Sequence, residues 1–216
     1  KAGQSLSGTR KKVIPQLAKA VARQLADLGF KQSKFDVVIS TSRWGETLSS
    51  PNSEPAKPAK AREDSRPTRS SGFDEIEFQF SPNPGEPAKP LRAIASSGEM
   101  ARVMLALKTV LAAEDEIPVL IFDEVDANVG GETANAVGEK MRQIAAKRQV
   151  LCITHLPQVA APAEAHYVVT KQLKHGRTIS EIALLDKKER VAELTRMLGG
   201  QGDAARKHAE ALLGSA

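Results

Sequence analysis

The alternation of hydrophobic and polar positions predicts a chain of mixed helices and strands. From Ser5 to Leu28, apolar residues recur every three to four positions, the repeat of an amphipathic helix. Gly29 is expected to end this helix, and Pro15 is expected to kink it or delay its start. The stretch 35–40 then predicts a strand, so the chain opens with a helix followed by a strand.

A second strand and a second helix are predicted in the middle of the chain. Apolar and polar residues alternate strictly over 75–80, which indicates a half-buried strand. The stretch 94–108, "IASSGEMARVMLALK", has apolar residues at helical spacing. Ser96 and Glu99 fit the S-x-x-E capping box at its start. This cap could simply stabilise the helix, or its small residues could let an anion approach the backbone N–H groups.

The following segment predicts a strand, a helix and another strand. The runs "IPVLIFDE" at 117–124 and "QVLCITH" at 149–155 are continuously apolar, so both strands are expected to be buried on both faces. A helix predicted over about 132–147 connects them, which makes the two strands parallel. A hairpin over about 166–185 is predicted next. The chain is expected to end in two short helices.

Composition favours a globular protein, and the start of the chain indicates a piece of a longer one. The 216 residues are 41% hydrophobic, enough for a real core. The single cysteine, Cys152, excludes an intrachain disulfide and a cysteine metal cluster. No apolar run approaches the roughly 20 residues of a membrane helix, and no signal peptide is apparent, so we expect a cytoplasmic protein without a membrane partner. The chain starts without Met and opens directly into a helix, which indicates a fragment.

The net charge of +5 is unevenly distributed. Residues 1–70 carry +8, whereas residues 71–216 carry −3. Within the basic part, residues 41–71 are rich in Pro, Ser and charged residues and predict a flexible insertion or linker. A basic segment can bind nucleic-acid phosphates or can simply be a solvated surface.

Three polar side chains are predicted to meet at one edge of the parallel strands. Asp123 and Glu124 follow the first strand, at the end where open α/β sheets bind ligands. In nucleotide hydrolysis one acid would hold Mg²⁺ and the other would orient or deprotonate the attacking water. The next strand delivers His155 to the same edge, where it could contact a terminal phosphate. The alternative is that the strand simply ends in solvated acids.

Three motifs together resemble a known family. "SSGEMARVMLALK", "VLIFDEVDANVGG" and "LCITHLPQVAA", in this order, resemble the ABC-type ATPase heads of the structural-maintenance-of-chromosomes (SMC) group. With "EFQFSPNPGEPAKPLRAIASSGE" before them, residues 72–200 are most similar to the RecN family of bacterial double-strand-break repair proteins. The resemblance implies an α/β head lobe, P-loop NTPase-like, with a mainly parallel sheet over 31–216. Residues 1–30 would be a stub of a returning coiled-coil helix.

The resemblance also implies roles for individual residues. Asp123 would serve Mg²⁺, Glu124 the attacking water and His155 the γ-phosphate. The remaining nucleotide-binding positions fall in the signature motif and the D-loop, and they are Ser96, Ser97, Gly98, Glu99, Asp126, Asn128 and Gly130. Ser97 departs from the family, because it replaces the first of two glycines and adds a side chain where phosphate approaches.

The phosphate-cradling motif G-x-x-x-x-G-K-[ST] does not occur in the 216 residues. In the family that loop lies in an N-terminal lobe, so the implied partners are this lobe, a second copy of the head, and DNA. ATP and Mg²⁺ are the implied cofactors, and a nucleoid-associated place in a bacterial cytoplasm is implied. We expect the chain alone to bind ATP poorly and to be nearly inactive as an ATPase. The alternatives are the head of a chromosome-organising SMC-type protein, a non-catalytic structural module, or a DNA-binding module that uses residues 1–70.

Overall fold

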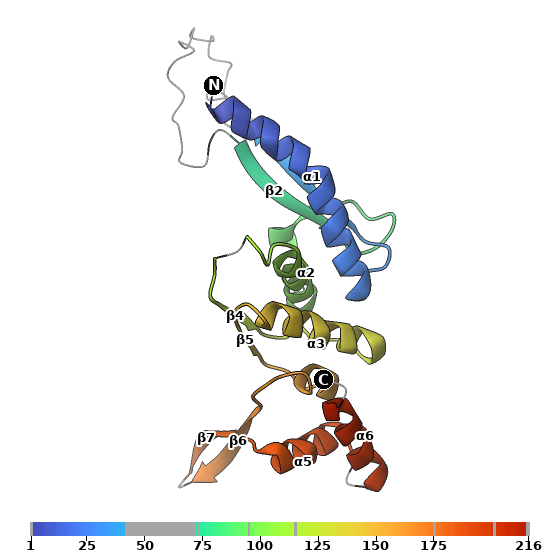
Figure 1. Ribbon diagram of the computed structural model, residues 1–216, viewed down its shortest axis with the longest axis vertical. Coiled ribbons are helices and arrows are strands. Elements are labelled where there is room, and N and C mark those ends of the chain that lie inside the picture. The colour runs from blue at the N-terminus through green and yellow to red at the C-terminus, as the bar shows by residue number, and fades with distance from the viewer. Residues whose placement is uncertain are drawn as a thin grey trace.

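The computed structural model describes residues 2–41, 72, 74–94, 96–114, 116–174, 176–200 and 202–214. Helices and strands follow one another along an elongated molecule, with α1 near one end and α5 and α6 near the other (Figure 1). The helices are α1 (Ala2–Asp27), α2 (Ser97–Val110), α3 (Gly131–Ala145), α4 (Pro157–Ala160), α5 (Lys187–Met197) and α6 (Asp203–Gly214). The strands are β1 (Lys34–Thr41), β2 (Asp74–Ser81), β3 (Lys89–Pro90), β4 (Val119–Phe122), β5 (Gln149–Cys152), β6 (Tyr167–Lys174) and β7 (Arg177–Leu184).

Pro15 does not delay the start of helix α1, which was one of its two expected effects. The helix already starts at Ala2 and continues through Pro15, so a late start is wrong. Its end is as predicted, because Gly29 has φ +93°. The Phe30 N–H donates to the Leu25 carbonyl at 3.0 Å, and the Gly29 N–H donates to the Ala26 carbonyl at 3.4 Å. These two bonds form a Schellman motif, which requires the left-handed conformation that glycine adopts without strain.

The first sheet is antiparallel and packs one face against α1. Phe35 pairs with Phe80, and Val37 pairs with Phe78. Phe35, Val37 and Phe80 are buried, and the Phe30 ring meets the Phe80 ring edge-on at 5.2 Å between centroids. The facing residues of α1 and the turn after it have no exposed surface: Val21, Leu25 and Leu28. The C-terminal half of α1 is therefore part of the core.

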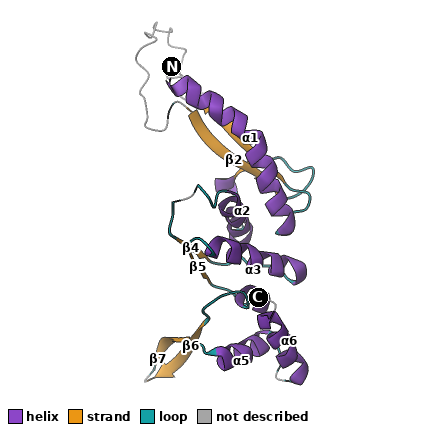
Figure 2. Ribbon diagram, in the orientation of Figure 1, coloured by secondary structure: helices purple, strands orange, loops and turns teal. Residues whose placement is uncertain are grey.

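Strands β4 and β5 are parallel and are connected by α3, as the sequence predicts. One face, with Leu120 and Phe122, packs into the same core as α2 and α3 (Figure 2). The prediction that these strands are buried on both faces is wrong, because Ile121 is 69% exposed on the opposite face. An apolar run cannot reveal whether the element that covers its second face belongs to the same chain.

The last third of the chain has its own small core. Ala160 and Ala161 pack with Leu194 of α5 and Ala209 of α6. Asp186 and Glu189 form a reciprocal capping box at the start of α5. The predicted hairpin is confirmed as β6 and β7, although its tip at residue 175 lies outside the described residues. Gly199 has φ +76° at the predicted break between α5 and α6.

The α/β class is confirmed, but the mainly parallel sheet that the resemblance implies is wrong for the described residues, whose strands form three separate small sheets. Within the described residues β4–β5 is the parallel pair, and the pairs β1–β2, β2–β3 and β6–β7 are antiparallel. The insertion predicted at 41–71 lies, beyond Thr41, outside the described residues. The division at residue 30 between an arm and a head stays a prediction.

None of the described helices has both the length and the apolar content needed to cross a membrane.

Candidate nucleotide-binding site

The two acids emerge where β4 ends, and the parallel pairing brings the end of β5 to the same edge. Phe122 pairs with Cys152, and the Ile153 N–H donates to the Phe122 carbonyl at 3.0 Å. Asp123 and Glu124, one and two residues beyond the strand, are both exposed. The predicted convergence of β4 and β5 at this edge is therefore present.

The start of α2 contacts the second acid directly. The Ser97 hydroxyl donates a hydrogen bond to the Glu124 carboxylate. Glu124 has φ +56°, a left-handed conformation that is costly for a residue with a side chain. Strained backbone of this kind concentrates at functional sites. The signature segment and the acidic strand end thus form one cluster.

Gly98 allows this close approach. A Cβ atom at position 98 would lie 2.8 Å from the Ala127 Cβ and 3.1 Å from the Glu124 carbonyl oxygen. Both distances are shorter than normal packing permits. The glycine is thus required for packing α2 against residues 124–127, whether or not phosphate also approaches it.

Half of the predicted capping box is present at α2. The Glu99 N–H donates to the Ser96 hydroxyl at 3.3 Å, and the Met100 N–H donates to the Ser96 carbonyl at 3.0 Å. The N–H groups of Ser97 and Gly98 are the remaining donors of the first turn. Donors in this position, at the positive end of a 14-residue helix, suit an anion.

Arg102 fastens α2 to the same loop and was missed by the sequence analysis. Its Nη1 donates to the Ala127 carbonyl at 2.9 Å, and its guanidinium lies 5.1 Å from the centre of the Phe30 ring. Burial lowers the pKa of Arg102, and the nearby Glu99 carboxylate partly opposes this. A charged residue beside an apolar stripe is normally solvated, so no signal in the sequence marked it.

Asp126 connects the loop after β4 to the loop after β5. Its carboxylate accepts hydrogen bonds from the Thr154 hydroxyl and, at 3.0 Å, from the His155 N–H. The His155 Nδ1 lies 3.2 Å from the same oxygen. The Asp126 side chain is 3% exposed, whereas that of His155 is 71% exposed. Asp126 therefore holds His155 in place while the imidazole remains accessible, and Thr154 is a second residue that the sequence analysis missed.

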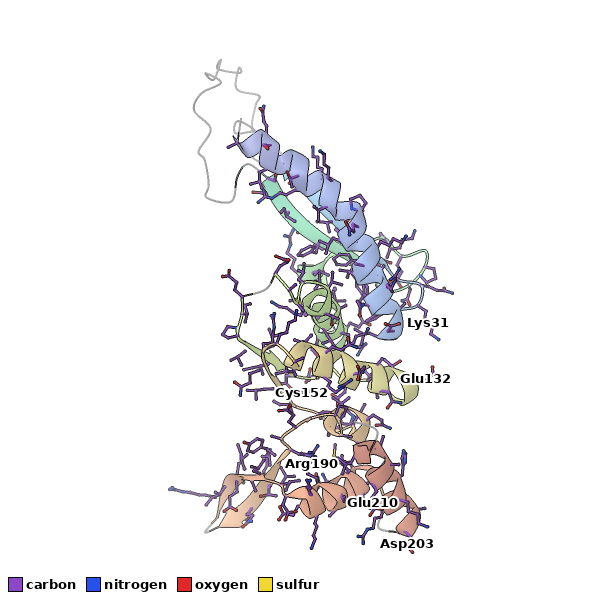
Figure 3. The ribbon with its side chains drawn as sticks, in the orientation of Figure 1. Lys31, Glu132, Cys152, Arg190, Asp203 and Glu210 are labelled. Atoms are coloured by element: carbon purple, nitrogen blue, oxygen red, sulfur yellow. The ribbon has the colours of Figure 1, made fainter. Side chains whose placement is uncertain are left out.

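Cys152, the last residue of β5, lies in the middle of the molecule (Figure 3). Burial raises the pKa of its thiol to about 12, with smaller contributions from the negative charges of Asp126 and Asp123. The protonated thiol has no nucleophilic character at neutral pH, so Cys152 is a packing residue.

The other two D-loop positions lie at the outer side of the cluster. Asn128 is exposed and has φ +58°. Gly130 is extended and precedes the first residue of α3, with open space where a Cβ would lie. Their backbones are accessible to a molecule that approaches the start of α3.

The described side chains fit Mg²⁺ only as a partial site. Among the described residues, no three His, Cys, Asp or Glu side chains are grouped to hold a metal ion. Mg²⁺ commonly binds through one or two carboxylates together with phosphate oxygens and water. Asp123 can supply one such carboxylate, so the arrangement fits an ion that arrives with a nucleotide.

Comparison with solved structures supports the fold class. The chain is similar to the Smc head domain with a coiled coil and joint from Pyrococcus yayanosii, with a TM-score of 0.52 and 18% identity. The match covers 86% of this chain and 29% of that one. Together with the α/β architecture, it shows that the chain shares the fold of an SMC head domain.

Curated sequences narrow the class further, although no family model matches the chain. It is 38% identical over 213 residues to the DNA repair protein RecN of Bacillus subtilis, and 42% identical over 214 residues to that of Treponema pallidum. These matches cover 97% and 98% of this chain. The chain is thus homologous to the C-terminal part of RecN proteins, and it spans about a third of their length.

Proposed function

We propose that the chain is the C-terminal lobe of an ATP-hydrolysing head in a RecN-like DNA double-strand-break repair protein. The observation that carries this proposal is the convergence of three separate segments at one edge of β4–β5. Ser97 contacts Glu124, and Asp126 holds His155 beside the same strand ends. Each segment alone is unremarkable, but together they supply an anion-binding helix start, two acids and an imidazole.

Each residue has a distinct task in this proposal. Asp123 binds the Mg²⁺ that accompanies ATP, and Glu124 orients the attacking water and accepts its proton. His155 hydrogen-bonds the γ-phosphate. Asp126 acts through His155, because its side chain is buried and faces the imidazole. When bound, Mg²⁺ would neutralise part of the negative charge of the phosphates.

The signature segment serves the nucleotide of a second head. Its positions Ser96, Ser97, Gly98 and Glu99 open α2, where the free N–H groups and the Ser97 hydroxyl can contact a γ-phosphate. The D-loop positions Asn128 and Gly130 border the same approach. Two heads would then enclose two ATP molecules, and hydrolysis would release the heads from one another.

A P-loop lobe from outside this chain would complete the site. One face of β4–β5 is exposed and, apart from Gln149, apolar; we call its apolar residues Val119, Ile121, Leu151 and Ile153 the open face. Contiguous apolar surface of this kind marks an interface. The homologous proteins are about three times as long as this chain, so their additional length has room for such a lobe.

DNA is the proposed ligand of the complete protein. Helix α1 contains a single acidic residue, Asp27. Its exposed basic residues are Lys11, Lys12, Lys19 and Arg23. Basic side chains in a row contact phosphates without reading sequence. The remaining basic residues of 1–70 lie largely outside the described part of the chain.

The proposal is tested by mixing this chain with a separately expressed P-loop lobe and measuring ATP hydrolysis. We expect activity only in the mixture, with a loss of at least 100-fold in the Glu124→Gln variant. Glu132→Gln is the matched control, because Glu132 is an exposed acid in the first turn of α3. Strong hydrolysis by the chain alone, or equal activity of the Glu124→Gln variant, would refute the proposal.

A further inference from the structure

The contact between Ser97 and Glu124 joins two residues that the proposed function assigns to different nucleotides. Glu124 serves the nucleotide bound by its own head, whereas Ser97 serves the nucleotide of the second head. In this chain, however, the Ser97 hydroxyl donates to the Glu124 carboxylate of the same head. Resting on the proposed function, we infer that Ser97 is a positioning residue that restrains Glu124 until the second head's nucleotide engages it.

The chemistry of a hydroxyl makes the two contacts mutually exclusive. An ionised carboxylate only accepts hydrogen bonds, and so do phosphate oxygens, so Ser97 must donate in both cases. A serine hydroxyl has one proton. When that proton turns to a phosphate, the bond to Glu124 is broken. A glycine at position 97, as in most of the family, would have no such exchange.

The surroundings favour this exchange because they hold both residues close without burying them. Gly98 fixes the start of α2 against the carbonyl of Glu124 and against Ala127, so Ser97 cannot move far from the acid. Both Ser97 and Glu124 are exposed. The left-handed backbone of Glu124, φ +56°, gives its side chain a direction that an ordinary strand end would not give it. A phosphate can therefore reach the hydroxyl from solvent.

The consequence is a coupling between the two nucleotide sites of a head pair. A head whose Ser97 contacts no phosphate keeps its own Glu124 restrained and hydrolyses slowly. Filling the opposite site removes the restraint. One hydroxyl thereby makes hydrolysis at one site depend on occupancy of the other.

The bond itself can be tested on the chain without nucleotide. The side-chain carboxyl carbon of Glu124 is observed by NMR and assigned by its disappearance in Glu124→Gln. We expect Ser97→Ala to shift this signal, because the carboxylate loses its donor. Ser96→Ala is the matched control, since its hydroxyl accepts from the Glu99 N–H, and it should leave the signal in place. An unshifted signal in Ser97→Ala would overturn the inference, whatever the ATPase activity.

The restraint is tested in heads completed with the P-loop lobe. In a mixed pair, one head carries a substituted P-loop lysine and binds no nucleotide, so the Ser97 of the other head lacks a phosphate. We expect Ser97→Ala in the nucleotide-binding head to raise its turnover roughly two- to tenfold, the value of one hydrogen bond. The same substitution in the other head should instead weaken ATP binding.

The outcomes separate the inference from the proposed function. Unchanged or lower turnover with Ser97→Ala in the nucleotide-binding head overturns the restraint. Absence of ATP hydrolysis in all pairs, combined with a shifted Glu124 signal, overturns the proposed function and leaves the bond supported. In a second pair, with both P-loops intact, Ser97→Ala should not raise turnover, because each Ser97 hydroxyl would already contact a phosphate.

Discussion

The two sheets of the molecule that border the main core differ in what their outer faces present to solvent. The outer face of β1–β2 is largely polar, with Asp36, Ser40 and Glu75 exposed and Val38 as an apolar exception. The open face of β4–β5 consists of apolar side chains, with Ile121 and Ile153 more than 60% exposed. Both sheets contribute residues of their inner faces to the same core, among them Phe80 and Phe122.

Under the proposed function, this difference separates the part of the fold that is complete within this chain from the part that a second lobe would cover. A polar outer face is the normal finish of an antiparallel sheet in water. Parallel sheets are normally covered on both faces, so an apolar outer face on a parallel pair is suited to a second covering layer. The candidate site lies at the end of this second sheet, so the proposed P-loop lobe would both cover the open face and complete the site.

The largest expected effect concerns the open face. Ile121→Lys should weaken association with the P-loop lobe by about 100-fold or more, because the charge would be buried without a partner. The isolated variant should remain as stable as the parent, since the side chain is 69% exposed. The dissociation constant of the two lobes, measured by calorimetry, tests this.

Val38→Lys is the control for the open-face prediction, because Val38 is 39% exposed on the outer face of the complete sheet. It should leave lobe association unchanged. Equal weakening by both substitutions would remove the distinction between the two sheets.

The next effect concerns the carboxylate that connects the two strand ends. Asp126→Ala should lower the free energy of unfolding by about 2–4 kcal/mol, because the Thr154 hydroxyl and the His155 N–H lose their acceptor. Denaturant unfolding of the isolated chain measures it. Asp123→Ala removes an exposed acid three residues earlier and should change stability by less than about 0.5 kcal/mol. Similar losses in both variants would contradict the structural role of Asp126.

A smaller effect is expected where α2 meets the loop after β4. Gly98→Ala should destabilise the chain by about 1–3 kcal/mol, because the added Cβ lies 2.8 Å from the Ala127 Cβ. Gly130→Ala should be nearly neutral, since its backbone is extended and the space around it is open. The two melting temperatures test this, and a neutral Gly98→Ala would mean that α2 does not pack tightly on the loop.

The smallest expected effect concerns helix α1, which packs against the β1–β2 sheet. Gly8 lies within α1 with open space around its missing side chain. Gly8→Ala should stabilise the chain by about 0.5–1 kcal/mol through the higher helix propensity of alanine. Thermal unfolding would show the gain. A loss of stability would indicate that this end of α1 is not a regular helix in solution.

Much of the fold could be predicted because local rules decide it. The end of α1 at Gly29, the parallel pairing around α3 and the β6–β7 hairpin each follow from a short pattern. The extent of burial of β4 and β5 could not be predicted in this way. Hydrophobicity shows that a strand face is suited to burial, but the covering element can lie outside the sequence in hand.

The candidate site was predicted less evenly. The positions of Asp123, Glu124 and His155 at one edge follow from strand direction alone. The Thr154 and Arg102 contacts depend on side-chain directions that no spacing rule specifies. Asp126 was expected to face nucleotide as part of the D-loop, and whether its backbone does so stays a prediction, but its carboxylate is already occupied within the chain.

Arg102 gives the site a mechanical connection to the proposed arm. One part of its guanidinium lies over the Phe30 ring, three residues past the end of α1, and another part is hydrogen-bonded to the loop after β4. A rotation of the end of α1 would therefore pull or release the same loop that positions Glu124. Under the proposed function, movement of an arm that continues α1 would reach the candidate site as a displacement of this one buried side chain.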